Sequence, residues 1–339
     1  MSNLIDYRNL DTAEEFMDFL APWSAQHTNI DLKQYIFRGQ RNADHALIPF
    51  ALREDARDEM RKKMNLFLET HPEYTNSPSI LALVEYQLIR DFYRQADMHG
   101  LPVPVSKTLR NLHYKKTEFT TMTNWIEDAV WLPDDMLEAA ALAQHYGVPT
   151  RLLDWSYNPF IAAFFATLPK LEGQDSGFKH EGDFCLWGLN TEAVESLHKI
   201  YEAAKLEPMS VPFPEFPLKF VTPPYEGNPN LAAQQGLFTH WVSQPGNIKS
   251  ISSQATNIFT PADQGLEKQI ENFFKSLNFT GIDNMLLKVT LANTEAEKVA
   301  RYLRDLGYGP SRLFPGYEGI TREINERTHF TRKRKDERV

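Results

Sequence analysis

The chain has 339 residues, of which 42% are hydrophobic and 24% charged, and its formal net charge is −9. This composition is that of an ordinary globular protein with enough apolar residues for a sizeable core. The acidic balance excludes the basic whole-domain surface that is typical of nucleic-acid-binding domains, although a local basic groove remains compatible with it. Cys185 is the single cysteine, so an intrachain disulfide is excluded, and its apolar surroundings in the sequence favour a core position.

The chain shows no targeting or metal-binding pattern. Its N-terminus lacks the basic flank and apolar core of a signal peptide. The longest apolar run, residues 160–166, is far shorter than the ~20 residues that span a bilayer. No histidine or cysteine pair has the spacing of zinc ligands, so we expect no bound metal. These observations predict a cytoplasmic protein that acts without contact with a membrane.

Apolar periodicity, capping residues and breakers predict a series of helices. They fall at residues 12–25, 52–70, 78–99, 133–146, 159–168, 293–306 and 318–328. Alternating or continuous apolar runs predict strands at residues 35–37, 184–189, 236–241 and 285–291. Seven prolines within residues 208–230 exclude a regular helix there and favour an extended loop. The mixture predicts an α+β fold.

The elements also suggest how the chain is organised. We expect one domain over residues 1–339, with a helical insertion at residues 52–135 between the first strand and the rest of the sheet. Residues 330–339 hold the densest basic run, Arg332 to Lys335, and form a basic tail. Such a tail is either a solvated end or a contact for nucleic acid.

Three sequence blocks resemble the FRG-domain family, and a fourth does so more weakly. The first is FRGQ at residues 37–40, the motif that names the family. The second is AQHYGVPTRLLDWS at residues 143–156, followed by the apolar helix that contains AAFFA at residues 162–166. The third is AQQGLFT at residues 233–239, and the weaker fourth is LFPGYEG at residues 313–319. The resemblance covers residues 34–320, nearly the whole chain.

The FRG family is itself similar to ADP-ribosyltransferases, and this second resemblance implies a fold and a substrate. It implies a split β-sheet core that grips NAD as a substrate. Arg38 and Gly39 are similar to the first motif of those enzymes, in which a guanidinium holds a ribose or phosphate and a glycine admits the nicotinamide amide. The third motif normally supplies a glutamate, whereas this chain has Gln235. Asp154 or Glu318 could provide the missing carboxylate, and we favour Asp154.

The resemblance therefore implies a set of site residues. The catalytic candidates are Arg38, Asp154 and Gln235. The candidates for NAD binding are Arg38, Gly39, Gln40, His145, Thr150, Arg151, Trp155 and Ser156.

Several of these residues have an alternative structural interpretation. Arg38 could be a structural cation paired with Asp154, because a buried charge needs a partner. Asp154 could equally pair with Arg151, which we otherwise expect to meet a pyrophosphate. His145 ends a helix, where the dipole favours an imidazole.

The resemblance also implies an activity. It suggests a toxin or anti-phage defence enzyme that transfers ADP-ribose from NAD to a macromolecule, with RNA or DNA preferred over protein as the acceptor and an antitoxin as a partner. A binding module without turnover and an NAD glycohydrolase are the two alternatives, and the absent glutamate of the third block favours the first of them.

Overall fold

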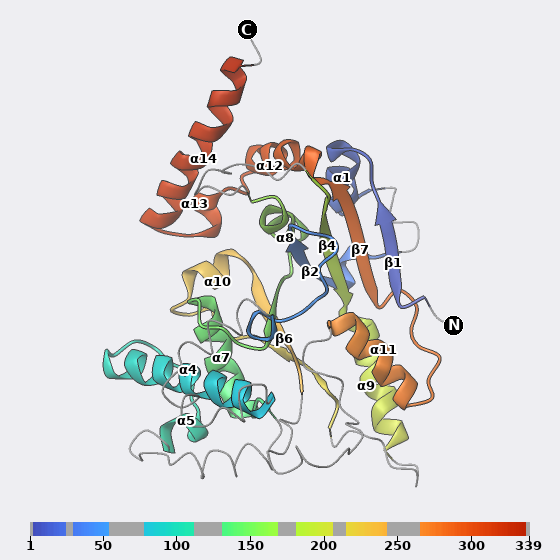
Figure 1. Ribbon diagram of the computed structural model, residues 1–339, viewed down its shortest axis with the longest axis vertical. Helices are drawn as coiled ribbons and strands as arrows, with labels where there is room; N and C mark the ends of the chain where they lie inside the picture. The colour runs from blue at the N-terminus through green and yellow to red at the C-terminus, as the bar shows by residue number, and fades with distance from the viewer. Residues whose placement is uncertain are drawn as a thin grey trace.

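The computed structural model describes residues 3–24, 30–53, 78–111, 131–168, 181–205, 215–242 and 265–336. In this part of the chain, helices lie on both faces of one mixed, open β-sheet, which confirms the predicted α+β class (Figure 1).

The sheet has seven strands in the order β1-β7-β4-β2-β3-β6-β5. Only β1 and β7 pair in parallel, and every other neighbouring pair is antiparallel. The strands are β1 (Ile5–Asn9), β2 (Tyr35–Gln40), β3 (Leu152–Ser156), β4 (Asp183–Asn190), β5 (Leu218–Val221), β6 (Gly236–Trp241) and β7 (Leu286–Ala292).

Helices connect and cover these strands. The longer ones are α1 (Ala13–Leu20), α4 (Pro78–Met98), α7 (Asp134–His145), α8 (Pro159–Ala166), α9 (Thr191–Ala204), α11 (Leu266–Ser276), α12 (Ala296–Asp305) and α14 (Tyr317–Asp336). The short ones are α5 (Lys107–Asn111), α10 (Pro229–Ala233) and α13 (Pro310–Leu313), with 3-10 turns at Leu32–Gln34, Phe50–Leu52 and Asn293–Glu295.

The sheet opens between β2 and β3. These two strands share a single residue pair, Phe37 with Ser156. In contrast, β2 pairs with β4 over six residues and β3 with β6 over five. The sheet therefore consists of two well-paired parts, β1-β7-β4-β2 and β3-β6-β5, joined at one point. Backbone groups beyond that point are free to diverge, which leaves room for a pocket.

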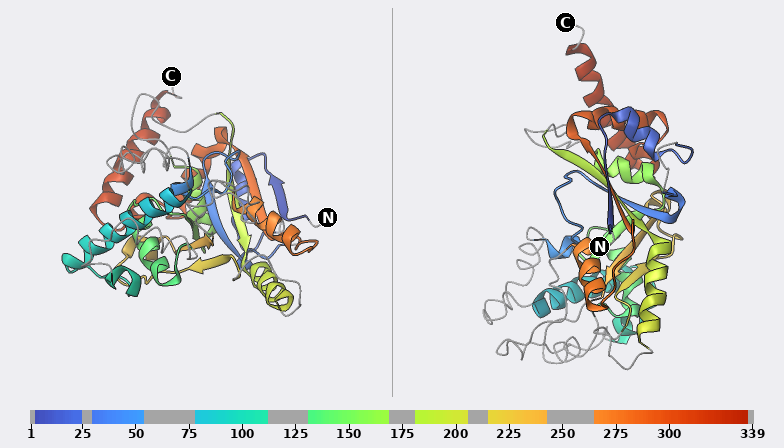
Figure 2. Two further views of the ribbon diagram at one scale, coloured as in Figure 1. Left: turned by 60° about the horizontal axis from the view of Figure 1, so that its bottom comes forward. Right: turned by 90° about the vertical axis from the view of Figure 1, so that its right-hand side faces the viewer.

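Two separate clusters of apolar side chains pack against one face of the sheet. Helices α4 and α7 pack over β3, β6 and β5 around Trp131 and Phe238. Helices α1, α8 and α12 pack over the other part of the sheet around Phe37 and Phe164. A third cluster, which includes Trp187, joins α9 and α11 to the opposite face (Figure 2). The opening thus lies between the α7 layer and the α8 layer.

Sequence patterns predicted the central elements well and the peripheral ones less well. Helix α7 and strand β6 lie where they were predicted, and α14 continues to Asp336, well beyond the predicted residue 328. The predicted loop at 208–230 was partly wrong, because β5 and the start of α10 fall within it. Strands β1 and β3 and helices α9 and α11 were not among the elements that these patterns predicted. Much of the proposed insertion, namely residues 54–77 and 112–130, lies outside the described residues, as do residues 337–339 of the basic tail.

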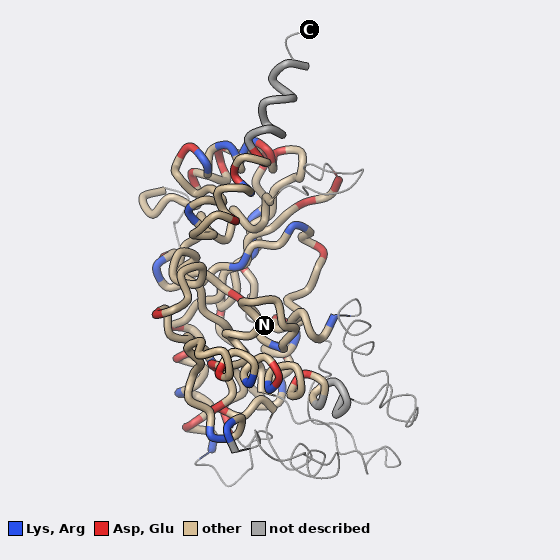
Figure 3. The backbone as a smooth tube through the Cα atoms, turned by 90° about the vertical axis from the view of Figure 1, so that its left-hand side faces the viewer, with Lys and Arg blue, Asp and Glu red and all other residues tan. Residues whose placement is uncertain are grey.

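Charged residues of both signs are interspersed over the described backbone (Figure 3). Among the described residues, no helix is both long and apolar enough to cross a membrane.

Candidate functional site

A pocket of about 260 Å³ lies where β2 and β3 diverge. It takes its walls from both parts of the sheet and from the helices on either side of the opening. Its lining residues are Phe37, Arg38, Gly39, Gln144, His145, Asp154, Trp155, Ser156, Ala162, Phe165, Leu231, Gln234, Gly236, Leu237 and Phe238.

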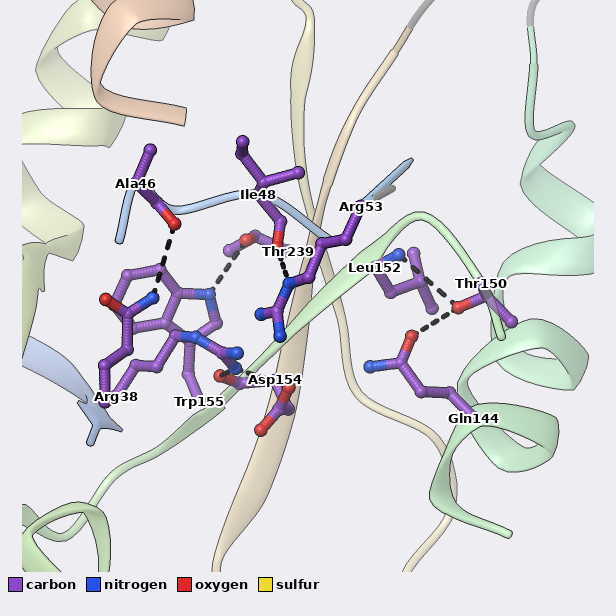
Figure 4. Close-up of polar contacts among 11 residues, drawn as sticks. Arg38, Ala46, Ile48, Arg53, Gln144, Thr150, Leu152, Asp154, Trp155 and Thr239 are labelled. Carbon is purple, nitrogen blue, oxygen red and sulfur yellow. Dashed lines mark hydrogen bonds and ion pairs between the residues drawn. The ribbon is translucent and has the colours of Figure 1, made fainter. Parts of the chain in front are cut away.

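Arg38 and Asp154 meet in this pocket. The Nη1 group of Arg38 donates to the carboxylate of Asp154 and, over 2.9 Å, to the Asp154 carbonyl oxygen. The side chain of Arg38 is only 11% exposed, whereas that of Asp154 is 64% exposed. The cation is therefore fixed within the protein, and the carboxylate that it holds is open to the pocket (Figure 4).

The electrostatic surroundings keep Asp154 ionised. Crowding by protein atoms alone would raise the pKa of this carboxyl, but the charge and hydrogen bond of Arg38 outweigh it and lower the pKa below the usual range. Arg53 adds to this effect. Its Nε donates to the carbonyl of Ile48 over 3.0 Å, and its guanidinium points toward Asp154 (Figure 4). At neutral pH the pocket thus presents one negative charge between two cationic side chains.

Two buried nitrogen atoms at the pocket have no hydrogen-bond partner among the described residues. They are Nε of Arg38 and Nε2 of His145. Burial lowers the pKa of His145, and the charge of Asp154 offsets this only in part, so the imidazole is neutral at pH 7. Unpaired buried polar atoms are rare in folded proteins because each costs free energy. They are typical of places where a ligand or a rearrangement supplies the missing partner.

Three predicted site residues contribute to the pocket mainly through their backbone or as support. Gly39 lies directly against helix α8, whose Ala162 backbone leaves no space for a side chain. The indole of Trp155 is buried and donates to the hydroxyl of Thr239 over 2.8 Å. The hydroxyl of Ser156 donates to the carbonyl of Gln234 over 2.8 Å. The ring of Trp155 therefore belongs to the core, and Phe165 is an aromatic residue that lines the pocket.

Thr150 and Arg151 are placed differently from what we predicted. Arg151 is buried, and its Nε and backbone N–H both donate to Glu85 on α4 over 2.6 Å. Its guanidinium also lies 5.7 Å from the ring of Trp131. The position expected for Arg151, at a pyrophosphate in this pocket, differs from the observed one, because Arg151 does not line the pocket and its Nε and backbone N–H bond to α4. Thr150 is fully buried and bonds to Gln144, so it supports the pocket wall without lining it.

The glutamines of the two motifs are also placed differently. Gln40 is buried and accepts a hydrogen bond from the indole of Trp187 over 3.1 Å, away from the pocket. Gln235 is exposed in the left-handed turn before β6, with φ of 47°, and does not line the pocket. Its neighbour Gln234 does, and its Nε2 donates to the carbonyl of Leu313 over 3.0 Å. The pocket is therefore lined by Gln234, whereas the sequence motif had pointed to Gln235.

Asp154 is the one carboxylate among the described residues that line the pocket. Glu318, the other candidate, lies in the first turn of α14 and pairs with Arg322 over 2.7 Å. No group of three or more potential metal-ligating side chains occurs in the described part of the chain. The pocket thus offers an ionised carboxylate, a buried guanidinium, a neutral imidazole and apolar walls.

Comparison with known families is consistent with the motifs. The model of the FRG domain matches residues 33–175, a span that holds β2, α7, β3 and α8 and therefore Arg38 and Asp154. The chain is therefore similar to the FRG-domain family over residues 33–175. No curated protein and no solved structure matches the chain.

Proposed function

We propose that this protein is an ADP-ribosyltransferase-like enzyme that consumes NAD in the pocket between β2 and β3. The observation that carries the proposal is the pairing of a buried Arg38 with an open, ionised Asp154 at the point where the sheet divides. The resemblance to ADP-ribosyltransferases implies a split β-sheet, and this sheet divides beside the strand that bears Arg38.

The charge of Asp154 suits this reaction. When the bond between ribose C1′ and the nicotinamide nitrogen breaks, the electron pair leaves with nicotinamide and the ribose becomes oxocarbenium-like. A fixed negative charge beside the sugar stabilises the positive charge that develops there. Asp154 can take this part because its carboxylate is ionised and open to the pocket. An acceptor nucleophile then forms a bond to C1′ and loses its proton to the surroundings.

Other pocket residues suit the binding of the substrate. Arg38 is only partly satisfied by Asp154, since its Nε has no partner among the described residues, and a ribose hydroxyl or phosphate oxygen can accept from its guanidinium. Phe165 provides an aromatic surface for the nicotinamide ring. Gly39 lines the pocket, so the backbone of β2 can contact a carboxamide there.

The test is to incubate the purified protein with NAD labelled in the ADP-ribose part, together with RNA, DNA and protein acceptors, and to follow nicotinamide release. We expect release, and we expect Asp154→Asn to reduce it at least 100-fold, in line with the loss of a main electrostatic group. Transfer of label identifies the acceptor class. Release with free ADP-ribose as the product would instead make the protein an NAD glycohydrolase.

The matched control is Asp134→Asn. Asp134 is also an exposed carboxylate, 75% exposed, paired with a lysine, Lys219, that is only 18% exposed. It lies at the start of α7 and outside the pocket. This variant should keep full activity. If folded wild-type protein releases no nicotinamide with any of the acceptors, the proposed enzymatic activity is refuted.

A binding module is the second candidate. The lining of the pocket favours this candidate. Among the described residues only one carboxylate, that of Asp154, lines the pocket, and its charge is paired with that of Arg38. Under this alternative the pocket binds a nucleotide without turnover. Binding of NAD in the absence of nicotinamide release would establish it.

For the acceptor, the proposal favours RNA or DNA. The reason is the basic run Arg332 to Lys335, which falls in the last part of helix α14. An intracellular toxin or defence enzyme of this kind would also require an antitoxin.

A further inference from the structure

A second cavity, of about 360 Å³, lies beside the candidate site. It is formed by α4, the chain that follows α4, the last turn of α7 and the residues that precede α10. Apolar side chains dominate its walls, among them Phe92, Leu142 and Tyr146. Gln95 and His99 supply polar groups. An apolar cavity of this size with a few polar groups is typical of small-molecule sites.

The two cavities are neighbours because they share α7 and α10. His145 lines the first cavity and the next residue, Tyr146, lines the second. The centres of these two rings are 5.3 Å apart, and the ring of Phe92 lies a further 6.2 Å from Tyr146. On the other side, Leu231 of α10 lines the first cavity. Asn228, the residue directly before α10, lines the second. One extended ligand could therefore reach both.

The aromatic residues of the second cavity are arranged for stacking. The rings of Phe92 and Tyr146 are nearly parallel, with an angle of 22° between their planes. Tyr146 is 55% exposed, so much of its surface is still open. Aromatic side chains stack on nucleobases, because both are flat and polarisable. The cavity thus fits a planar ring.

His99 and Gln95 can recognise the edge of such a ring. Nδ1 of His99 lies 2.8 Å from the backbone carbonyl of Gln95. A carbonyl only accepts hydrogen bonds, so Nδ1 carries the proton and Nε2 of the neutral ring keeps its lone pair. That lone pair can accept from an exocyclic amino group. The side-chain amide of Gln95 adds one acceptor and two donors. Adenine carries an amino group at C6 of the purine ring, whereas hypoxanthine carries an oxygen at the same position.

We infer that the second cavity is an adenine-binding site, and that it holds the adenine half of NAD while the nicotinamide half lies beside Arg38. The link to NAD rests on the proposed function, but the adenine site itself does not. The first cavity, about 260 Å³, is slightly below the 300–1,000 Å³ that is usual for ligand pockets, so a dinucleotide needs further surface. The second cavity supplies that surface.

Binding of AMP to the full chain, measured by calorimetry, tests the adenine site. We expect Tyr146→Ala and Phe92→Ala each to weaken binding roughly 10-fold or more, since base stacking on one aromatic residue has about this effect. The control is Tyr7→Ala, because Tyr7 is comparably exposed, at 59%, but lies on the edge strand β1. Equal affinity in all four proteins, or no binding of AMP to wild type, would overturn the inference.

IMP tests recognition of the ring edge. Wild type should prefer AMP over IMP, and His99→Leu should remove the preference while IMP binding stays as it was. A preference that persists in His99→Leu would show that His99 does not accept from the amino group.

Nicotinamide release from NAD and from nicotinamide mononucleotide tests the link between the cavities. Tyr146→Ala should raise the KM for NAD roughly 10-fold and leave the mononucleotide reaction unchanged, because the mononucleotide has no adenine. An equal loss with both substrates would overturn the link. If folded wild type releases no nicotinamide at all, the proposed function fails, and the AMP measurement alone decides the adenine site.

Discussion

The carbonyl oxygen of Ala162 occupies the space that a side chain at Gly39 would need, since an ideal Cβ there would lie 1.9 Å from that oxygen. A second backbone atom, the nitrogen of Ala166, would be 2.7 Å away. Helix α8 can approach β2 this closely only because Gly39 has no Cβ. This contact positions α8, and with it Phe165, beside Arg38.

Gly39→Ala should therefore destabilise the fold. Backbone atoms cannot move aside as a flexible side chain can, so we expect a loss of about 1–3 kcal/mol in the free energy of unfolding, or more. Urea denaturation measures it. The control is Gly188→Ala on the adjacent strand β4, where the nearest atoms belong to the side chains of Tyr35 and Leu287. A smaller loss for Gly39→Ala than for Gly188→Ala would contradict the packing argument.

Arg38 should govern the ionisation of Asp154. Because Arg38 lowers the pKa of this carboxyl against the opposing effect of the surrounding protein atoms, Arg38→Gln should raise that pKa. The titration of the Asp154 carboxyl carbon, followed by NMR, measures the change directly. In wild type the ion pair contributes to stability above the pKa of an unfolded Asp, about 3.9, and this contribution is lost as the pH falls. An unchanged pKa in Arg38→Gln would show that another group holds Asp154 ionised.

The two adjacent glutamines should behave differently. Gln234 lines the pocket and Gln235 does not. Under the proposed function, Gln234→Ala should raise the KM for NAD several-fold, as expected for the loss of about one hydrogen bond. Gln235→Ala should leave nicotinamide release unchanged. Sensitivity to Gln235 instead would restore the assignment that the sequence motif suggested.

The sequence offered the pairing of Arg38 with Asp154 as one of two interpretations, and the structure shows this pair because the strands that carry the two residues are adjacent in the sheet. The sequence could not predict the partner of Arg151, because Glu85 is 66 residues away along the chain and is brought near only by the packing of α4 on α7. Nor could composition reveal β5. It is an edge strand flanked by prolines, which edge positions tolerate and which sequence patterns associate with loops.

A local turn explains why Gln234, and not the predicted Gln235, lines the pocket. Gln235 takes a left-handed backbone conformation, with φ of 47°. Non-glycine residues adopt this conformation rarely, and sequence patterns do not mark it. Since the turn reverses the chain between α10 and β6, it is Gln234 that faces the pocket.

Glu85 and Arg151 should matter for stability. Both side chains are almost completely buried, at 1% and 5% exposed. Glu85→Gln would remove the negative charge that pairs with the buried guanidinium, and we expect a loss of about 3–5 kcal/mol in the free energy of unfolding. Lys199→Met, which breaks the exposed pair with Glu195, should cost at most about 1 kcal/mol. Equal, small losses in both variants would mean that Glu85 and Arg151 contribute no more than a surface pair.

His240 should make the fold sensitive to mild acid. Its ring is fully buried, and Nε2 accepts from the backbone N–H of Leu132 over 3.0 Å. Burial, together with the charges of Arg151 and Lys219, lowers the pKa of His240 to about 3. The unfolded state therefore binds a proton near pH 6.5 that the folded state binds only near pH 3. Stability from this residue is complete above pH 6.5 and falls as the pH decreases toward 3.

Between pH 7 and pH 4.5 this linkage should reduce the free energy of unfolding by about 2.5 kcal/mol. His240→Gln removes the titrating group and should show a correspondingly smaller decrease over the same interval, although its stability at pH 7 will be lower because the bond from Leu132 is disturbed. Urea denaturation of both proteins at the two pH values gives the difference. Parallel decreases in the two proteins would show that His240 does not remain neutral in the folded state, or that other groups dominate the acid response.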